Sequence, residues 1–257
     1  MSNEIFKFHG SLNRELKIRI QRLDIYDEII QKVELSNKAA VEAILRGGVV
    51  ELCAQLEGFC KSSIRQYLHY INSEIEDLSN VHVGLRTALA AHIFLQKTNN
   101  LLGKINNVGE INKFAHFYNE IFILFHEPDK SNRKELSQKF IKNFLEEKSG
   151  IDWNYFEELM WVVGIPIDEK VSAYEKSLNE LIGRRNEIAH GDESLDKKGG
   201  PWLEIESETR VWGERLGMVR YIMKYIYDRI RIASEKNQFL ITSKGKFSLE
   251  EFSPRDH

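Results

Sequence analysis

Proline is scarce in this chain, and the scarcity bears on the fold. The 257 residues include only four prolines, Pro128, Pro166, Pro201 and Pro254, so none precedes position 128. Proline interrupts helices and is frequent in the turns of β-sandwiches. The sequence therefore favours long uninterrupted helices over a β-sandwich.

Cysteine is rarer still, with only Cys53 and Cys60. Two cysteines exclude a disulfide framework. Seven residues of helix place them on one face but about 10 Å apart, which is too far for a bridge within the helix. We expect two small core residues of a reduced protein.

The chain also lacks a strong net charge and long apolar runs. The net charge of −3 and the isoelectric point near 6.3 provide no global field for nucleic acid, so any such site must be a local patch. No run of 18 apolar residues suggests a membrane span, and the first ten residues contain no apolar signal core. We expect a cytoplasmic globular protein with no membrane partner.

Apolar residues recur at intervals of three and four, which predicts an all-α bundle. One helix is expected from Ser11, as its N-cap, to Val33, a longer one from Ser36 to Ile71, and a third over 83–97. The pair Gly47-Gly48 lies inside the second helix, where glycine is unfavourable. Either this helix kinks there or another helix crosses it closely.

The second half predicts three further helices and an insertion. One helix spans 152–163, one is capped by Asp168 and ends at Gly191, and the last begins near Ser207. Residues 98–151 are less regular but rich in aromatic residues, so we expect a packed helical insertion. The whole reads as an antiparallel bundle in a single domain over 1–242, followed by a polar tail over 243–257.

A cluster of polar residues lies at the end of the helix that Asp168 caps. Its buried stripe continues onto Arg185, and the neighbouring row carries Asn186 and His190. A helix C-terminus favours a protonated imidazole, so these groups suit a phosphate. The alternative is structural, because such an arginine often pairs with a carboxylate and such a histidine with the last carbonyls.

The spacing Arg185-Asn186-x-x-x-His190 resembles the signature of the HEPN superfamily, and the flanking residues Arg184 and Ile188 to Gly191 fit it. A second segment from Leu45 to Lys61, closest over Leu56–Lys61, is similar to an upstream helix of a prokaryotic stand-alone HEPN-like nuclease family. The resemblance covers about 36–75 and 152–240 and leaves the insertion at 98–151 unexplained.

The resemblance implies a HEPN-like helical bundle with metal-independent endoribonuclease activity and no cofactor. In such a homodimer, two arginines and two histidines meet at one RNA phosphate, and attack by the 2′-OH leaves a 2′,3′-cyclic phosphate. By position, His190 would be the general acid and base and Arg185 the phosphate clamp, while Asn186 would orient the imidazole or hold a phosphate oxygen. Such proteins often act as toxins or anti-phage effectors, so an antitoxin or defence-system partner is expected.

Other interpretations remain open. The domain could be a catalytically silent HEPN module that binds a nucleotide or a protein such as a nucleotidyltransferase, or a plain helical scaffold. Glu57 either forms a surface pair with Lys61 or is a partly buried acid that pairs with Arg185 or Arg184. Arg184 itself is expected to face solvent or to contact RNA phosphate as an auxiliary residue.

Two further patterns carry less weight. The histidines show no spacing typical of metal ligands with cysteine or acidic residues, so no metal site is expected. The last helix alternates tyrosines with basic residues. These are expected on its exposed and intermediate faces, although they could also stack on or hold single-stranded RNA. They are Arg220, Tyr221, Lys224, Tyr225, Tyr227, Arg229 and Arg231.

Overall fold

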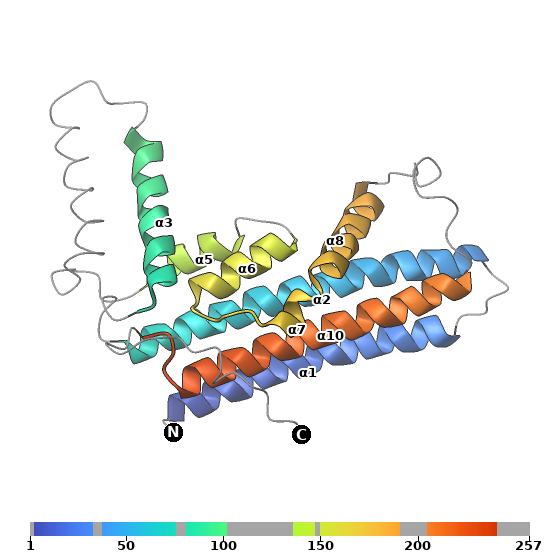
Figure 1. Cartoon of the computed structure of the whole chain (residues 1–257), viewed down its shortest axis with the longest axis horizontal. Helices are drawn as coiled ribbons and strands as arrows, with labels where there is room; N and C mark the ends of the chain where they lie inside the picture. The colour runs from blue at the N-terminus through green and yellow to red at the C-terminus, as the bar shows by residue number, and fades with distance from the viewer. Residues whose placement is uncertain are drawn as a thin grey trace.

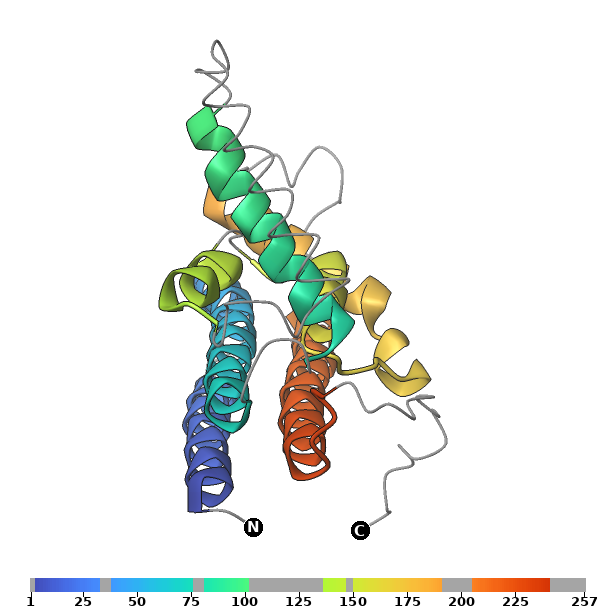
Figure 2. The same ribbon diagram turned by 90° about the vertical axis from the view of Figure 1, so that its left-hand side faces the viewer.

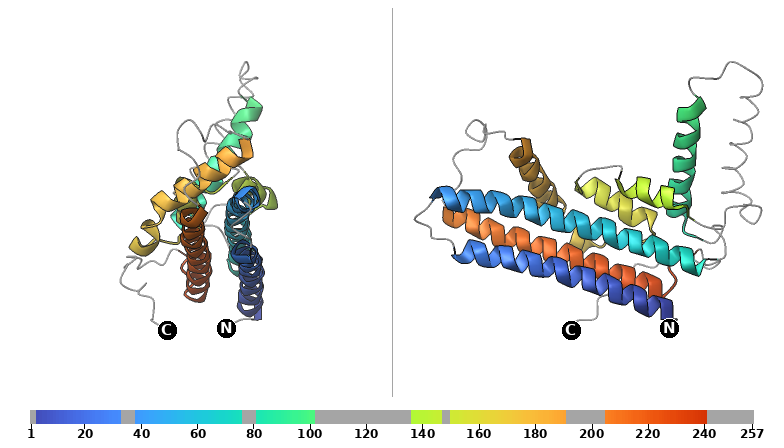
Figure 3. Two further views of the ribbon diagram at one scale, coloured as in Figure 1. Left: turned by 90° about the vertical axis from the view of Figure 1, so that its right-hand side faces the viewer. Right: turned by 180° about the vertical axis from the view of Figure 1, so that it is seen from behind.

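Three long helices lie side by side and carry the rest of the fold (Figure 1). The computed structural model describes residues 3–32, 38–75, 81–101, 136–146, 150–190 and 205–240. The long helices are α1 (Asn3–Lys32), α2 (Lys38–Glu74) and α10 (Ile205–Glu235). Helices α2 and α10 run in the same direction and α1 runs opposite to both (Figures 1 and 3).

Five shorter helices lie on one side of this layer (Figure 1). They are α3 (Val83–Leu101), α5 (Gln138–Glu146), α6 (Trp153–Val162), α7 (Glu169–Ser172) and α8 (Glu175–His190). Figure 2 shows α3 rising away from the long helices. Within the described ranges the only β pairing is an isolated bridge between Val81 and Leu240, so the all-α prediction is confirmed. No helix in these ranges is both long and apolar enough to cross a membrane.

The core lies between the long helices and under the shorter ones. Helix α10 buries apolar residues that recur every three or four positions: Trp212, Leu216, Val219, Met223, Ile226, Ile230 and Ala233. Cys53 and Cys60 are free and buried, as expected. The predicted N-cap at Ser11 is wrong, because the buried stripe of α1 already begins at Ile5 and Phe8 and the helix starts at Asn3.

Helix α2 runs unbroken through Gly47 and Gly48, which decides between the two expectations for this pair. A Cβ added to Gly48 would lie 2.6 Å from the Trp212 ring, and one added to Gly47 would lie 3.4 Å from the Tyr26 hydroxyl. The two glycines therefore let α10 and α1 approach α2 closely.

The single helix predicted from Asp168 to Gly191 is divided into α7 and α8. The Asp168 side chain caps α7 as expected, accepting a hydrogen bond from the Val171 N–H at 3.1 Å. The Tyr174 N–H then donates to the Val171 carbonyl three residues back, at 2.9 Å. This tight turn ends α7, and the Tyr174 ring packs against Tyr221 of α10 at 5.3 Å between ring centroids.

Only part of the predicted insertion lies in the described ranges. Helix α5 buries Phe140, Ile141 and Leu145, which confirms packing for this part. The segment just before α5 is attached to α2, because the Asn72 side chain of α2 makes two hydrogen bonds with the Leu136 backbone, of 2.7 and 3.0 Å. Residues 102–135, 147–149 and 191–204 and the tail over 243–257 lie outside the described residues, so the domain limits stay a prediction.

Candidate functional site

Helix α8 carries the predicted motif and packs into the core over its first half only. Its first half buries Leu178 and Leu181. The Leu181 carbonyl lies 3.9 Å from the Cys53 thiol of α2. Beyond Leu181 no residue of α8 is fully buried, and the helix points away from the long helices (Figure 1). The motif therefore lies on the half of α8 that projects from the bundle.

Arg185 and Asn186 are brought together on this half. Arg185 is partly buried as a residue, as expected at the edge of the core, while its guanidinium contact is exposed: Nη1 donates to Asn186 Oδ1 at 3.1 Å. The amide oxygen is neutral, so this contact orients the guanidinium without cancelling its charge. The arrangement leaves a fixed positive group suited to an oxyanion.

His190 is exposed and is the last residue of α8. The helix stays regular from Arg185 to His190, and five residues at about 100° each turn the side-chain direction by about 140° net. Asn186 and His190, four residues apart, share a side of the helix. In one chain, Asn186 is therefore next to Arg185 in sequence and on the same side of the helix as His190. The side chains of Arg185 and His190 point away from each other.

The two interpretations of Glu57 are each correct in part. Its carboxylate pairs with Lys61 Nζ at 2.6 Å, as the first interpretation has it. The pair is not a simple surface contact, because only 24% of the Glu57 side chain and 18% of the Lys61 side chain are exposed. Glu57 is thus a partly buried acid that is held by the cation on its own helix.

Arg184 differs from the expectation of a solvent-facing residue. Its side chain is only 17% exposed and pairs with Glu187 at 3.2 Å. Arg184 follows Leu181 by three residues, so its aliphatic stem lies beside the buried stripe while its charged end meets the carboxylate.

Arg215 of α10 belongs to this neighbourhood and was missed by sequence reasoning. Burial raises the pKa of the Cys53 thiol to about 12, and the charges of Arg185 and Arg215 lower it while that of Glu57 raises it. Charged groups of α2, α8 and α10 therefore all act on the pKa of the thiol. A signal was present in the sequence, since Arg215 shares a helix stripe with the buried Met218 and Ile222.

The tyrosine and basic row on α10 is not a wholly exposed face. Tyr225 is buried, and its hydroxyl donates to the Pro166 carbonyl at 2.8 Å and accepts from the Asp168 N–H at 3.2 Å. Arg229 is buried too and bonds Asp168 at 2.5 Å. These contacts attach the N-terminus of α7 to α10. Because α8 follows α7, they also position α8.

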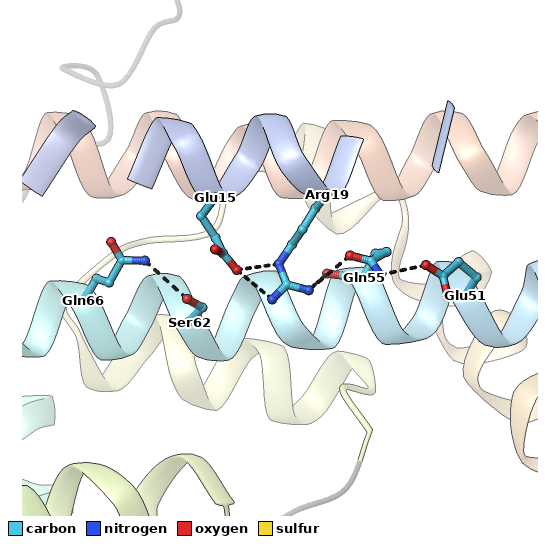
Figure 4. A network of polar contacts seen from close by, with 6 residues as sticks. All are labelled: Glu15, Arg19, Glu51, Gln55, Ser62 and Gln66. Atoms are coloured by element: carbon cyan, nitrogen blue, oxygen red, sulfur yellow. Dashed lines mark hydrogen bonds and ion pairs between the residues drawn. The ribbon is translucent and has the colours of Figure 1, made fainter. Parts of the chain in front are cut away.

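A polar contact between α1 and α2 lies directly before the segment Leu56–Lys61 that was singled out for its family resemblance, and Figure 4 shows Arg19 of α1 between Glu15 and Gln55 there. Arg19 bonds Glu15 at 2.7 Å and the Gln55 side chain at 3.2 Å. Its guanidinium occupies the space that a Cβ on Gly58 would need. The glycine of this segment therefore leaves room for a partly buried cation between α1 and α2, which is a structural role.

The chain matches the sequence model of the RiboL-PSP-HEPN family over residues 14–230, from within α1 to the end region of α10. The match is wider than the two stretches on which the resemblance was based. The comparison with curated proteins gives no significant match. The comparison with solved structures gives none either. Among the described residues, no three His, Cys, Asp or Glu side chains are grouped as metal ligands.

Proposed function

Because this chain belongs to the RiboL-PSP-HEPN family, we propose that it is an endoribonuclease that cleaves RNA without a metal ion. HEPN domains are associated with nuclease-like or RNA-related functions and are often ribonucleases. The observation that carries the proposal is the Arg185–Asn186 hydrogen bond on the projecting half of α8, four and five residues before the exposed His190.

The residues fit a transesterification. His190 accepts the proton of an RNA 2′-OH, and the 2′ oxygen attacks the adjacent phosphorus. The bond from phosphorus to the 5′ oxygen breaks, and that oxygen takes up a proton from a second imidazole. The products are a 2′,3′-cyclic phosphate and a 5′-OH end. Arg185 stabilises the charge that develops on the phosphoryl oxygens, and Asn186 orients Arg185.

A second copy of the chain supplies the second imidazole in this proposal. Arg185 and His190 of one chain diverge by about 140° around α8. Two copies that face each other through the projecting halves bring an arginine of one copy near a histidine of the other. The proposed enzyme is therefore a homodimer with a composite site.

A ribonuclease of this kind damages its own cell, so the proposal includes a role as a toxin or anti-phage effector with a neutralising partner protein. The second candidate is a silent HEPN module that binds a nucleotide or a protein such as a nucleotidyltransferase. If the protein stays monomeric, this second candidate is favoured, because the side chains of Arg185 and His190 in one chain point in different directions.

The first test is cleavage of labelled transfer RNA and total RNA in EDTA. We expect the wild type to yield cyclic-phosphate ends, and Arg185→Ala and His190→Ala to lose at least about 100-fold in rate, as for removal of a general acid–base group. Arg210→Ala is the matched control, because Arg210 lies on an exposed face of α10 with Glu214 and takes no part in the proposed site.

Mixing the two inactive variants tests the composite site. A mixture of Arg185→Ala and His190→Ala chains should exceed both single variants but stay well below the wild type, because a mixed dimer retains one arginine and one histidine from different copies and lacks the second imidazole. Intact RNA in all lanes, with a folded dimeric wild type, would contradict the nuclease and support the binding module. A stabilising effect of Arg185→Leu would point instead to a helical scaffold.

A further inference from the structure

Helix α1 carries two apolar stripes on different sides. The first is buried against α2 and α10 and comprises Leu12, Leu16, Leu23 and Ile30. The second faces away from the bundle and comprises Ile18, Ile25 and Ile29, whose exposed fractions are 43%, 58% and 45%. Single exposed apolar residues are ordinary on a protein surface, but a helix that is apolar on both sides is typical of one that is covered on both. The second stripe therefore indicates a surface that a partner covers.

Arg22, which is also exposed, completes the spacing of the second stripe. Ile18, Arg22, Ile25 and Ile29 follow one another at intervals of four, three and four residues. These are the intervals of the seam along which one helix packs against another. The four residues form what is called here the α1 seam, which spans about 16 Å of the helix axis. Its spacing fits a helix as the partner better than a strand or a loop.

Three cations lie in or beside the α1 seam. Arg14, Lys17 and Arg22 are exposed, and none of them makes an ion pair with the residues that the structure describes. The nearby carboxylates of Asp24 and Glu28 are already held by Arg220 and Lys32. This side of α1 thus combines aliphatic side chains with uncompensated positive charge. An arginine in a seam between helices is satisfied when a carboxylate faces it.

A second copy of the chain does not supply the negative charge. Docked by the same face, it would bring a second set of the same cations, and like charges across an interface cost affinity. RNA supplies negative charge but lacks matching apolar groups, because its bases stack on aromatic rings and the apolar members of the seam are all aliphatic. A protein helix with one apolar and one acidic side supplies both.

We propose that the α1 seam, with Arg14 and Lys17 beside it, is the docking surface for an acidic amphipathic helix of a partner protein. Apolar side chains of the partner cover the isoleucines, and its carboxylates pair with the three cations. The inference does not rest on the proposed function. Figure 1 shows α2 and α10 between α1 and α8, so a helix docked on α1 leaves the motif helix free.

The test uses designed helical peptides and the full chain. One fluorescein-labelled peptide, about three heptads long, has a leucine seam flanked by glutamates. A second peptide has lysines in place of the glutamates, and a third keeps the glutamates but has glutamines in place of the leucines. Dissociation constants are measured by anisotropy for the wild type, Arg22→Glu, Ile25→Gln and a triple variant that also reverses the charges of Arg14 and Lys17.

We expect the wild type to bind only the first peptide. Arg22→Glu and Ile25→Gln should each weaken this binding at least about tenfold, as for residues at the centre of an interface. The triple variant should prefer the lysine peptide, because the charges are exchanged. Phe6→Gln is the control for an exposed apolar residue, since Phe6 is 75% exposed on α1 but lies about 120° around the helix from Ile18. Arg210→Glu on α10 is the control for charge, and neither control should change the affinity.

Four results would overturn the inference. The first is equal binding of the acidic and lysine peptides, or binding that Arg22→Glu and Ile25→Gln leave unchanged in folded protein. The second is self-association in sedimentation velocity that Ile25→Gln abolishes, which makes a second copy the occupant. The third is tighter peptide binding by a chain without residues 243–257, which makes that segment the occupant. The fourth is binding of a 2′-O-methyl RNA strand that depends on Arg22 but not on Ile25.

Discussion

Gly48 decides how closely α10 approaches α2. The Trp212 ring that covers it is almost fully buried, and its indole N–H donates to Asp27 of α1 at 2.9 Å. Because Gly48 has no side chain, the large Trp212 ring of α10 can contact both α2 and α1.

Gly48→Ala should lower the free energy of unfolding, although alanine is normally preferred to glycine inside a helix by about 1 kcal/mol. The added methyl group would overlap a ring with no room to move, and overpacking costs about 1–3 kcal/mol. Urea denaturation measures the change. Gly10→Ala is the control, because nothing lies within 4 Å of its added Cβ, and this variant should gain about 0.5–1 kcal/mol. A stabilised Gly48→Ala would mean that Trp212 can shift.

The sequence reached some residues of the candidate site and missed others for physical reasons. Arg185 was predicted at the edge of the core because one helix stripe carries it there, and it is partly buried. The burial of Arg184 and the nearness of Arg215 depend on where α8 and α10 meet α2, which no single helix pattern contains. The catalytic roles of Arg185, Asn186 and His190 stay predictions.

The network at the entrance of α7 acts on a whole helical element. Arg229, with 7% of its side chain exposed, bonds the same Asp168 that caps α7. Its guanidinium also lies 4.9 Å from the Tyr225 ring centroid. Because α8 follows α7 after a tight turn, this network fixes where the motif helix begins.

Arg229→Met should destabilise the protein, at the low end of the roughly 3–5 kcal/mol typical of removing one partner of a buried ion pair, because Asp168 is partly exposed. Adding Asp168→Asn should recover part of the loss, since asparagine also caps helices and leaves no unpaired charge. Urea denaturation of both single variants and the double variant gives the coupling. Arg231→Met, whose partner Glu235 is near the surface, should cost about 0–1 kcal/mol. Equal losses for Arg229→Met and Arg231→Met would contradict a special role for the network.

Helical periodicity predicted the elements better than their ends. The helices α2, α6 and α10 were predicted from the sequence, because burial against the bundle repeats every three or four residues. The break between α7 and α8 was not predicted, since Val171, Tyr174 and Leu178 keep helical spacing across it. The tight turn there goes with the contact of Tyr174 with Tyr221, which is tertiary.

Buried titratable groups set the pH range over which the whole molecule is stable. Burial lowers the pKa of His9 and His82 below 6.5, so the unfolded chain binds more protons as the pH falls below about 6.5, and stability is lost there. Burial raises the pKa of Cys53 and Cys60 from 9.0 to about 12, so stability is lost above pH 9 as the unfolded thiols ionise.

We expect a plateau of stability from these groups between about pH 6.5 and 9, measured by urea denaturation across pH 5 to 10. His9→Gln should flatten the acid side, and Cys60→Ala should flatten the alkaline side while lowering stability at every pH through the lost packing. His69→Gln serves as a control for the first variant, because His69 is exposed. An acid limb that His9→Gln leaves unchanged would assign it to other groups.

For the whole molecule, apolar spacing predicted an all-α bundle and the motif predicted a HEPN-type fold, and the structure and the family match confirm both. The single domain over 1–242 and its insertion stay predictions. The assembly is a different matter, because periodicity reports only that a face is buried and does not say whether the same chain or a second copy buries it.

Helix α8 is held by packing at its N-terminal half, and its C-terminal half has little support. Leu178 and Leu181 anchor it, whereas Ile182 and Ile188 are only partly covered and His190 is exposed. Amide hydrogens near the anchor should exchange only when the whole bundle opens, and those near His190 should exchange through local fraying. A molecule that packs on the free half would slow that exchange, so the motif itself would report when its partner arrives.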